Sequence, residues 1–212
     1  MKKQQSGFTL VEIAIVMVII GLLLGGVLKG QEVITNARIK NINNDFSGIS
    51  AAIYSYQDRY ATLPGDDPAP GAHVNGGLLA DDSAGTAGDG LIDGNFEDAG
   101  ALVAAVSDPE SALAWQHMRA AGLLSGITTS SLQPQHAFGA VIGLQTGDND
   151  PDNGLNGING VVIAFRTVPG DMAAILDSQN DDNDPDTGSI RNSAALAAYL
   201  FDGTTYDILF EL

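Results

Sequence analysis

The chain has 212 residues, with 9 basic and 26 acidic side chains and a formal net charge of −17 at pH 7. An acidic surface without a cluster of Lys or Arg repels the phosphates of nucleic acid, so no nucleic-acid partner is expected. The chain has no cysteine, which excludes disulfide bonds and a thiol nucleophile. The length suits one globular head together with one long helix.

The first 28 residues combine a short polar start with a long apolar run. The start, MKKQQSG, ends at Gly7, and the run from Phe8 to Leu28 contains a single charged residue, Glu12. At about 1.5 Å per residue this run forms roughly 31 Å of helix, which is enough to cross a bilayer core. Lys2 and Lys3 favour a cytoplasmic start with the rest of the chain outside.

Two features separate this segment from an ordinary secretory signal. A carboxylate in the middle of a membrane segment costs on the order of 2.5–3.5 kcal/mol on insertion scales, so Glu12 is expected to have a function. An ordinary signal is cut after its apolar run, whereas the plausible cut here, between Gly7 and Phe8, precedes it.

The sequence GFTLVE, Gly7 to Glu12, resembles the class III signal of type IV pilins and of the pseudopilins of type II secretion. The resemblance implies that a prepilin peptidase cuts after Gly7 and that the new amino terminus, Phe8, is N-methylated. It also implies that Glu12 pairs with the terminal amine of a neighbouring subunit during assembly. The physics suits that role, because a buried carboxylate and a buried ammonium are each costly alone and offset each other when paired.

The resemblance extends to about Tyr60, and the chain departs from many pilins in two ways. Lys29 occupies the place where many have a helix-kinking proline, and the cysteines of the usual C-terminal disulfide are missing. A proline kink is therefore not expected, although Gly21, Gly25 and Gly26 could soften the helix.

The helix is expected to continue well past the apolar run. Its later apolar residues recur at spacings of three and four, which places them on one face of a helix. They are Ile39, Ile42, Phe46, Ile49, Ile53, Tyr56 and Tyr60. We therefore predict one helix over about 9–59, broken by Leu63-Pro64-Gly65. The expected fold is an α+β pilin fold in which the C-terminal half of this helix packs on a small, loop-rich head with an antiparallel sheet. The expected parts are a leader over 1–7, a membrane or filament-core helix over 8–35, and a head over 36–212.

Residues 61–100 show no helix or strand pattern, whereas the residues that follow do. Asp108 as N-cap, Pro109 and Gly122 predict a helix over 108–122, with Trp115 in the core, where Phe46 is also expected. Strands are predicted over 136–144, 160–168 and 206–212, and short helices over 171–177 and 193–201.

A near repeat in the head suggests a calcium site. DNDPDNG at 148–154 and DNDPDTG at 182–188 each place carboxylates two residues apart, and such side chains can converge on a hard cation. The alternative is a solvated turn in which Asp and Asn cap backbone amides. The candidate ligands are Asp177, Asp182, Asp184 and Asp186 for the downstream copy, Asp148, Asp150 and Asp152 for the upstream copy, and Asp89, Asp93 and Asp98 for a third place. Calcium is the one cofactor that these patterns suggest.

Patterns typical of enzymes are lacking. His73, His117 and His136 have no zinc-ligand spacing, and the sequence contains neither a G-x-S-x-G elbow nor a phosphate loop. The adjacent pairs Asp66/Asp67 and Asp181/Asp182 are expected to form turns. No catalytic residue is predicted, and the chain is not expected to be an enzyme.

The sequence therefore predicts a structural subunit of a type IV pilus or pilus-like filament. The expected partners are copies of itself in a helical filament, the prepilin peptidase, the pilus assembly machinery and, before assembly, the inner membrane. Before assembly the head would lie in the periplasm, and afterwards in an extracellular pilus or a periplasmic pseudopilus. The alternatives are a type II secretion pseudopilin and a membrane-anchored binding or enzymatic domain that never polymerises.

Overall fold

The structure is a computed structural model that describes residues 9–79, 87–98, 100, 103–105, 108–147, 155–194, 196 and 198–212. It divides into two compact units, one ending at Arg38 and one spanning Ile39–Leu212. This division lies a few residues beyond the expected start of the head at residue 36.

Helix α1, Leu10–Tyr60, is a single α-helix of 51 residues, as predicted. Its residues up to Arg38 form the described part of the first unit, where the apolar side chains between Leu10 and Ile34 are exposed in the isolated chain. An 18-residue window of this helix has a mean hydropathy of 2.7, so α1 is long and apolar enough to cross a membrane. Because apolar side chains are expelled from water, this segment requires a lipid or protein environment.

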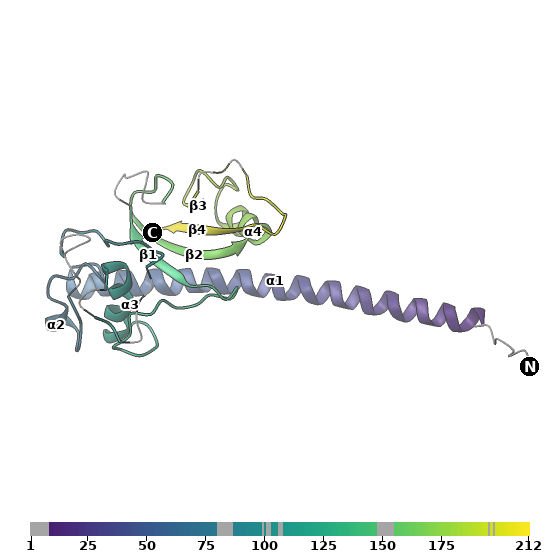
Figure 1. The fold of residues 1–212 in the computed structure, drawn as a ribbon, viewed down its shortest axis with the longest axis horizontal. Helices are drawn as coiled ribbons and strands as arrows, with labels where there is room; N and C mark the ends of the chain where they lie inside the picture. The colour runs from purple at the N-terminus through teal and green to yellow at the C-terminus, as the bar shows by residue number, and fades with distance from the viewer. Residues whose placement is uncertain are drawn as a thin grey trace, which may run out of the picture. The chain divides into compact units, whose positions relative to one another are not determined.

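The second unit contains the C-terminal part of α1 and a four-stranded sheet. The strands are β1 (Ile142–Thr146), β2 (Val161–Pro169), β3 (Ile190–Asn192) and β4 (Thr205–Glu211). Their order is β1-β2-β4-β3, and every neighbouring pair is antiparallel (Figure 1). A long N-terminal helix with a small antiparallel sheet is an α+β arrangement consistent with the pilin fold, which confirms the predicted fold class.

The predicted stripe of α1 faces the rest of the head: its residues up to Ile53 share a core with the sheet, and Tyr56 and Tyr60 stack on histidines outside the sheet. Five of its seven residues are buried, and Phe46 and Tyr60 are half-buried. The Phe46 ring lies 4.9 Å from the ring of Phe210 on β4, and Phe210 in turn contacts Phe165 on β2 edge to face at 5.2 Å. Aromatic pairs at these separations are stabilised beyond their burial, so α1 and the sheet share one core.

The sheet buries both faces, which follows from the alternation of side chains along a strand. Ile163, Phe165, Ile208 and Phe210 belong to the main core with α1. The opposite face forms a second, smaller core, made of Phe96, Leu155, Ile158, Val162, Ala164 and Leu209. Strands buried on both faces carry consecutive apolar residues, as VVIAF in β2 does.

Among the described residues, the second unit also contains three shorter helices: α2 (Pro70–His73), α3 (Glu110–Ala120) and α4 (Gly170–Asn180). Trp115 is fully buried in α3, as predicted, and Gly122 follows the helix with a φ of 71°, which suits a glycine stop. The prediction that Asp108 caps α3 is wrong, because the N-cap is Pro109. The Asp108 carboxylate instead accepts a hydrogen bond from the Ser131 hydroxyl at 2.6 Å.

Several other predicted elements need correction. The strand predicted over 136–144 begins only at Ile142, because His136 N donates to Ala140 O and closes a turn. The described residues of 193–201 form no helix, because Tyr199 and Leu200 are tied by side-chain bonds to Asp177 and Tyr206. Strand β3 was not predicted, and α4 runs three residues beyond its predicted end at Asp177.

The shared core predicts a large difference between two phenylalanines of the head. Phe210 is 3% exposed and Phe201 is 72% exposed, so Phe210→Ala should lower the free energy of unfolding by about 3–5 kcal/mol and Phe201→Ala by far less. Urea unfolding of the full chain in detergent micelles, followed by the fluorescence of the single tryptophan, Trp115, measures this difference. Equal losses in the two variants would contradict the packing described here.

Candidate functional site

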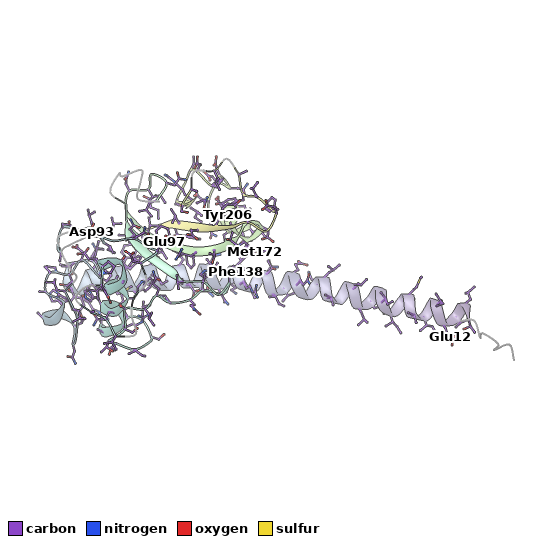
Figure 2. All side chains as sticks on the ribbon, viewed as in Figure 1. Glu12, Asp93, Glu97, Phe138, Met172 and Tyr206 are labelled. Atoms are coloured by element: carbon purple, nitrogen blue, oxygen red, sulfur yellow. The ribbon has the colours of Figure 1, made fainter. Side chains whose placement is uncertain are left out.

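Glu12 lies in the first turn of α1, where Figure 2 labels it, and its carboxylate is held by Thr9. Thr9 donates to Glu12 Oε2 twice, from its backbone nitrogen at 2.8 Å and from its hydroxyl at 2.7 Å. In return, Glu12 N donates to Thr9 Oγ1 at 3.3 Å. This reciprocal pair is a capping box, which satisfies amides that a helix N-terminus leaves without intrahelical partners.

The capping box fixes the Glu12 carboxylate beside the start of the helix. Gly7 and Phe8, the predicted cleavage pair, lie outside the described residues, so their part in the site stays a prediction. Sequence reasoning singled out Glu12 but missed Thr9, although the spacing T-x-x-E before an apolar run is the signature of a capping box. A carboxylate held at this end of the helix can pair with an ammonium group, and nothing in the arrangement points to bond making or breaking.

A second candidate lies in the loop that follows α4. Among the described residues, oxygen atoms of Asp177, Asp181 and Asp182 lie within 4.8 Å of one another, close enough to share a cation. Asp177 and Asp182 were predicted ligands, whereas Asp181 was expected only to form a turn. Asp184 and Asp186 are not part of this group, and the upstream candidates Asp148, Asp150 and Asp152 lie outside the described residues.

The same carboxylates also accept hydrogen bonds from their own loop. Asp177 accepts from Asn183 N and from the Tyr199 hydroxyl, both at 2.9 Å, and Asp181 accepts from Ile190 N at 2.8 Å. Burial raises the pKa of Asp177, and the negative charges of Asp182 and Asp181 act in the same direction. A bound cation would relieve the repulsion between these carboxylates. The hydrogen bonds from backbone amides, taken alone, are those of an ordinary turn. Calcium binding here therefore stays a prediction.

The third acidic candidate does not gather its carboxylates. Asp89 Oδ1 accepts from Leu91 N at 3.0 Å and Asp98 Oδ2 accepts from Asn95 N at 2.7 Å, so both cap local turns. Asp89, Asp93 and Asp98 are not among the described acidic residues whose ligand atoms lie together. We assign no metal ligand to this segment.

The adjacent pair Asp66/Asp67 does more than form a turn. Both residues are buried, and Asp66 accepts hydrogen bonds from the backbone nitrogens of Gly88, Asp89 and Gly90. Asp67 accepts from the Tyr56 hydroxyl of α1 at 2.7 Å, bonds His73 Nδ1 at 2.7 Å, and accepts from Ala69 N at 2.9 Å. The Asp66 bonds join segments 22–24 residues apart in the sequence, and the Asp67 bonds join α1 to α2.

Hydrogen bonding decides the ionisation of Asp67. Burial by itself would raise the pKa of this carboxyl, but the bonds from His73 and Tyr56 outweigh burial and hold the pKa below its usual range. Asp67 is therefore charged at neutral pH and acts as an acceptor only.

The three histidines also hold loops: His73 and His117 both lie near Asp67, whereas His136 lies beside Arg166 of β2. His117 Nδ1 accepts from Gly65 N at 3.0 Å while its Nε2 donates to Leu78 O at 2.8 Å, an arrangement that fixes the neutral tautomer. Burial lowers the pKa of His117 accordingly. His136 uses both ring nitrogens in the same way, with Phe138 N and Arg166 O.

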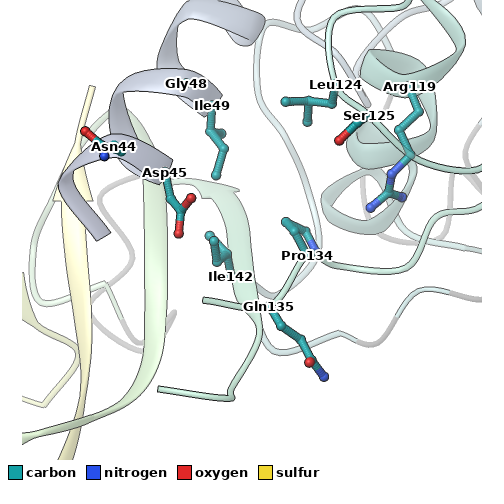
Figure 3. A pocket seen from close by; sticks show the side chains of 10 residues that line it. All are labelled: Asn44, Asp45, Gly48, Ile49, Arg119, Leu124, Ser125, Pro134, Gln135 and Ile142. Carbon is teal, nitrogen blue, oxygen red and sulfur yellow. The ribbon is translucent and has the colours of Figure 1, made fainter. Parts of the chain in front are cut away.

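An open cleft of about 230 Å³ lies between α1 and the segments around Arg119 and Pro134 (Figure 3). Its walls include the apolar side chains of Ile49, Leu124 and Ile142. The guanidinium of Arg119 donates to Ser130 O and Leu132 O, so it serves the loop beside the cleft. The cleft is smaller than a typical ligand pocket of about 300–1,000 Å³, and we assign it no ligand.

Comparison with known families gives a match at the N-terminus. Residues 2–28 match the model of the prokaryotic N-terminal methylation motif, which is the class III prepilin-type signal of type IV pilins and pseudopilins. Comparisons with curated proteins and with solved structures gave no match. The matched segment contains Gly7, Phe8, Thr9 and Glu12.

If the acidic loop after α4 binds calcium, calcium should raise the thermal stability of the head. Calcium at a hundred times its dissociation constant would stabilise the head by about 2.7 kcal/mol. Thermal unfolding of the full chain in micelles, with calcium and with chelator, measures the effect, and Asp182→Ala should remove it. The control is Asp202→Ala, an exposed acidic residue outside the group. An unchanged midpoint would favour a simple turn over a metal site.

Proposed function

We propose that this chain, whose residues 2–28 are a class III prepilin-type signal, is a structural subunit of a type IV pilus or pilus-like filament. The N-terminal methylation motif is the observation that carries the proposal, since it supports a type IV pilin-like or pseudopilin-like protein. The motif implies processing by prepilin peptidase and assembly into filaments. It suggests a structural role and not an enzymatic one.

The structure supports the proposal at both ends of α1. The part of α1 that lies within the motif is an exposed, apolar helix that fits anchoring in the inner membrane before assembly. The helix then supplies the stripe on which the antiparallel sheet packs. In this proposal the helix anchors the head on the periplasmic side of the membrane. On assembly the helix leaves the membrane and enters the filament, and the head moves with it.

Glu12 is the residue proposed to guide assembly. In the unassembled chain Thr9 supplies its hydrogen bonds, which lowers the cost of a carboxylate at the edge of lipid. An incoming subunit could then be attracted by its unpaired carboxylate to the terminal ammonium of a subunit already in the filament. The pair would be formed away from water, where an unpaired partner is costly.

A type II secretion pseudopilin is the second candidate. The same N-terminal signal serves both systems. The head has no cysteine, and its acidic loop after α4 would suit a cation that takes the place of a disulfide, which favours this candidate. Deleting the gene separates the two: loss of surface filaments supports the pilus, and loss of protein secretion with intact pili supports the pseudopilus. A membrane anchor that never polymerises has no need of Glu12 and is disfavoured.

The proposed processing predicts a defined mature chain. Purified subunit should begin at Phe8 with a methylated amine, because the cut precedes the apolar run. Removal of residues 1–7 leaves 7 basic and 26 acidic side chains, a formal charge of −19. Mass spectrometry of the N-terminal peptide checks this, and Gly7→Leu should leave uncleaved precursor in the membrane. An intact Met1, or a cut after Leu28, would refute the assignment.

The proposed role of Glu12 predicts an assembly defect without a folding defect. Glu12→Ala should yield stable, processed subunit but few filaments, because a buried amine loses its partner at a cost of about 3–5 kcal/mol. The matched control is Glu32→Ala, an exposed glutamate on the same helix whose only described bond is to Lys29. Sheared filaments are quantified against membrane subunit by immunoblot. Normal filament yield from Glu12→Ala would rule out this role.

A further inference from the structure

The segment Gly88–Gly94, which we call the 88–94 loop, is fastened by two buried carboxyl groups. Asp66, 2% exposed, accepts hydrogen bonds from three successive backbone nitrogens at the start of the loop. Glu110, 3% exposed and the first residue of α3, accepts from Asp93 N at 2.9 Å near the loop's end. Asp93 O accepts in turn from Ser111 N at 2.9 Å. The loop therefore depends on carboxyl oxygens at both ends.

The middle of the 88–94 loop covers the outer edge of the sheet. Ile92 is fully buried, its nitrogen donates to Thr146 Oγ1 at 2.9 Å, and its carbonyl accepts from Thr146 N at 3.0 Å. Thr146 is the last residue of β1, which is an edge strand. An uncovered edge offers unpaired backbone groups to other chains. Holding the loop in place therefore protects part of this edge.

The charges that act most strongly on Glu110 are acidic. Asp66 comes from the segment before α2, and Asp89 and Asp93 come from the loop itself. Burial is the largest cause that raises the pKa of Glu110, and these three carboxylates add to it, so that the pKa reaches about 7. Burial also raises the pKa of Asp66. Charging both buried carboxyls places like charges in a poorly solvated region, which is unfavourable.

We propose that Glu110 and Asp66 form a pH-sensitive latch that closes the 88–94 loop over β1 when Glu110 is protonated and loosens it when Glu110 ionises. In the closed state a neutral Glu110 still accepts the Asp93 amide, and only the Asp66 charge requires amide donors. In the ionised state the two carboxylates that hold the loop, Glu110 and Asp66, repel each other, and this repulsion weakens the closed position. The latch lies in the head and does not depend on whether the chain forms a pilus or a pseudopilus.

The sign of the effect follows from proton linkage. The folded chain holds the Glu110 proton more tightly than the unfolded chain, whose glutamate has a pKa of 4.5. Stability from this group is therefore complete below pH 4.5, falls as pH rises towards about 7, and then levels off. Each pH unit in this window changes the folding equilibrium by up to about tenfold.

The test compares the full chain in micelles with Glu110→Gln, in chelator so that no divalent cation contributes. Glutamine keeps an acceptor for the Asp93 amide and cannot ionise, so the variant should lack the stability loss between pH 4.5 and about 7 and should exceed the unmodified chain above that pH. Glu97→Gln, an exposed glutamate that follows the loop, is the control and should keep the pH dependence. Identical pH profiles for Glu110→Gln and the unmodified chain would overturn the proposal.

Hydrogen exchange locates the effect. After correction for intrinsic rates, peptides covering 88–94 should lose protection between pH 4.5 and about 7 in the unmodified chain and keep it in Glu110→Gln. If that variant fails to fold, Asp89→Asn serves instead, since it removes a neighbouring charge and should move the transition to lower pH. A uniform loss of protection across the head, or an unmoved transition in Asp89→Asn, would refute a local latch.

Discussion

The apolar contact between the C-terminal part of α1 and the sheet is the interaction on which the head depends. Without it the stripe from Ile39 to Ile53 and part of one face of the sheet would be exposed to water. Few aromatic residues take part in this core. Phe210 contacts both Phe46 and Phe165, and aliphatic residues fill the space around them. Interiors of this kind lose stability sharply when one large side chain is removed.

Hydrogen bonds to carboxylates hold many of the loops against this core. Asp66, Asp67, Asp108 and Asp177 each accept hydrogen bonds from residues distant in the sequence or from successive loop amides. Bonds of this type to an ionised acceptor are stronger than neutral ones, and they need no oxidising environment. A cysteine-free chain with many Gly and Asp residues thereby obtains fixed loops. Like charges must then be placed close together, which is why burial and ionisation are coupled at Glu110.

Much of the fold follows from the sequence, since its strongest signals are local. The spacing of three and four predicts α1, and the apolar run VVIAF predicts β2. The errors arise where distant contacts decide the outcome. Residues 193–201 have the composition of a helix, but Tyr199 and Leu200 are fixed by Asp177 and Tyr206 instead. Strand β3 has only three residues, and its pairing with β4 gives no local pattern.

The candidate sites divide in the same way. Glu12 is evident because a charge in an apolar run is unusual, and the family match covers it. Thr9 is an ordinary residue until its bonds to Glu12 are seen. The roles of Asp66 and Glu110 depend on how far each is buried, and burial follows from packing that the sequence does not display.

The buried phenols of the head have a spectroscopic consequence. Burial and the neighbouring carboxylates of Asp67 and Asp177 raise the pKa values of Tyr56 and Tyr199, because an ionised phenol would face an acceptor that already carries a negative charge. Both hydroxyls are donors to those carboxylates and stay protonated while the head is folded. The buried pair therefore ionises only as the head opens. The ultraviolet absorbance of the phenolates of Tyr56 and Tyr199 in alkaline solution thus reports the integrity of the fold.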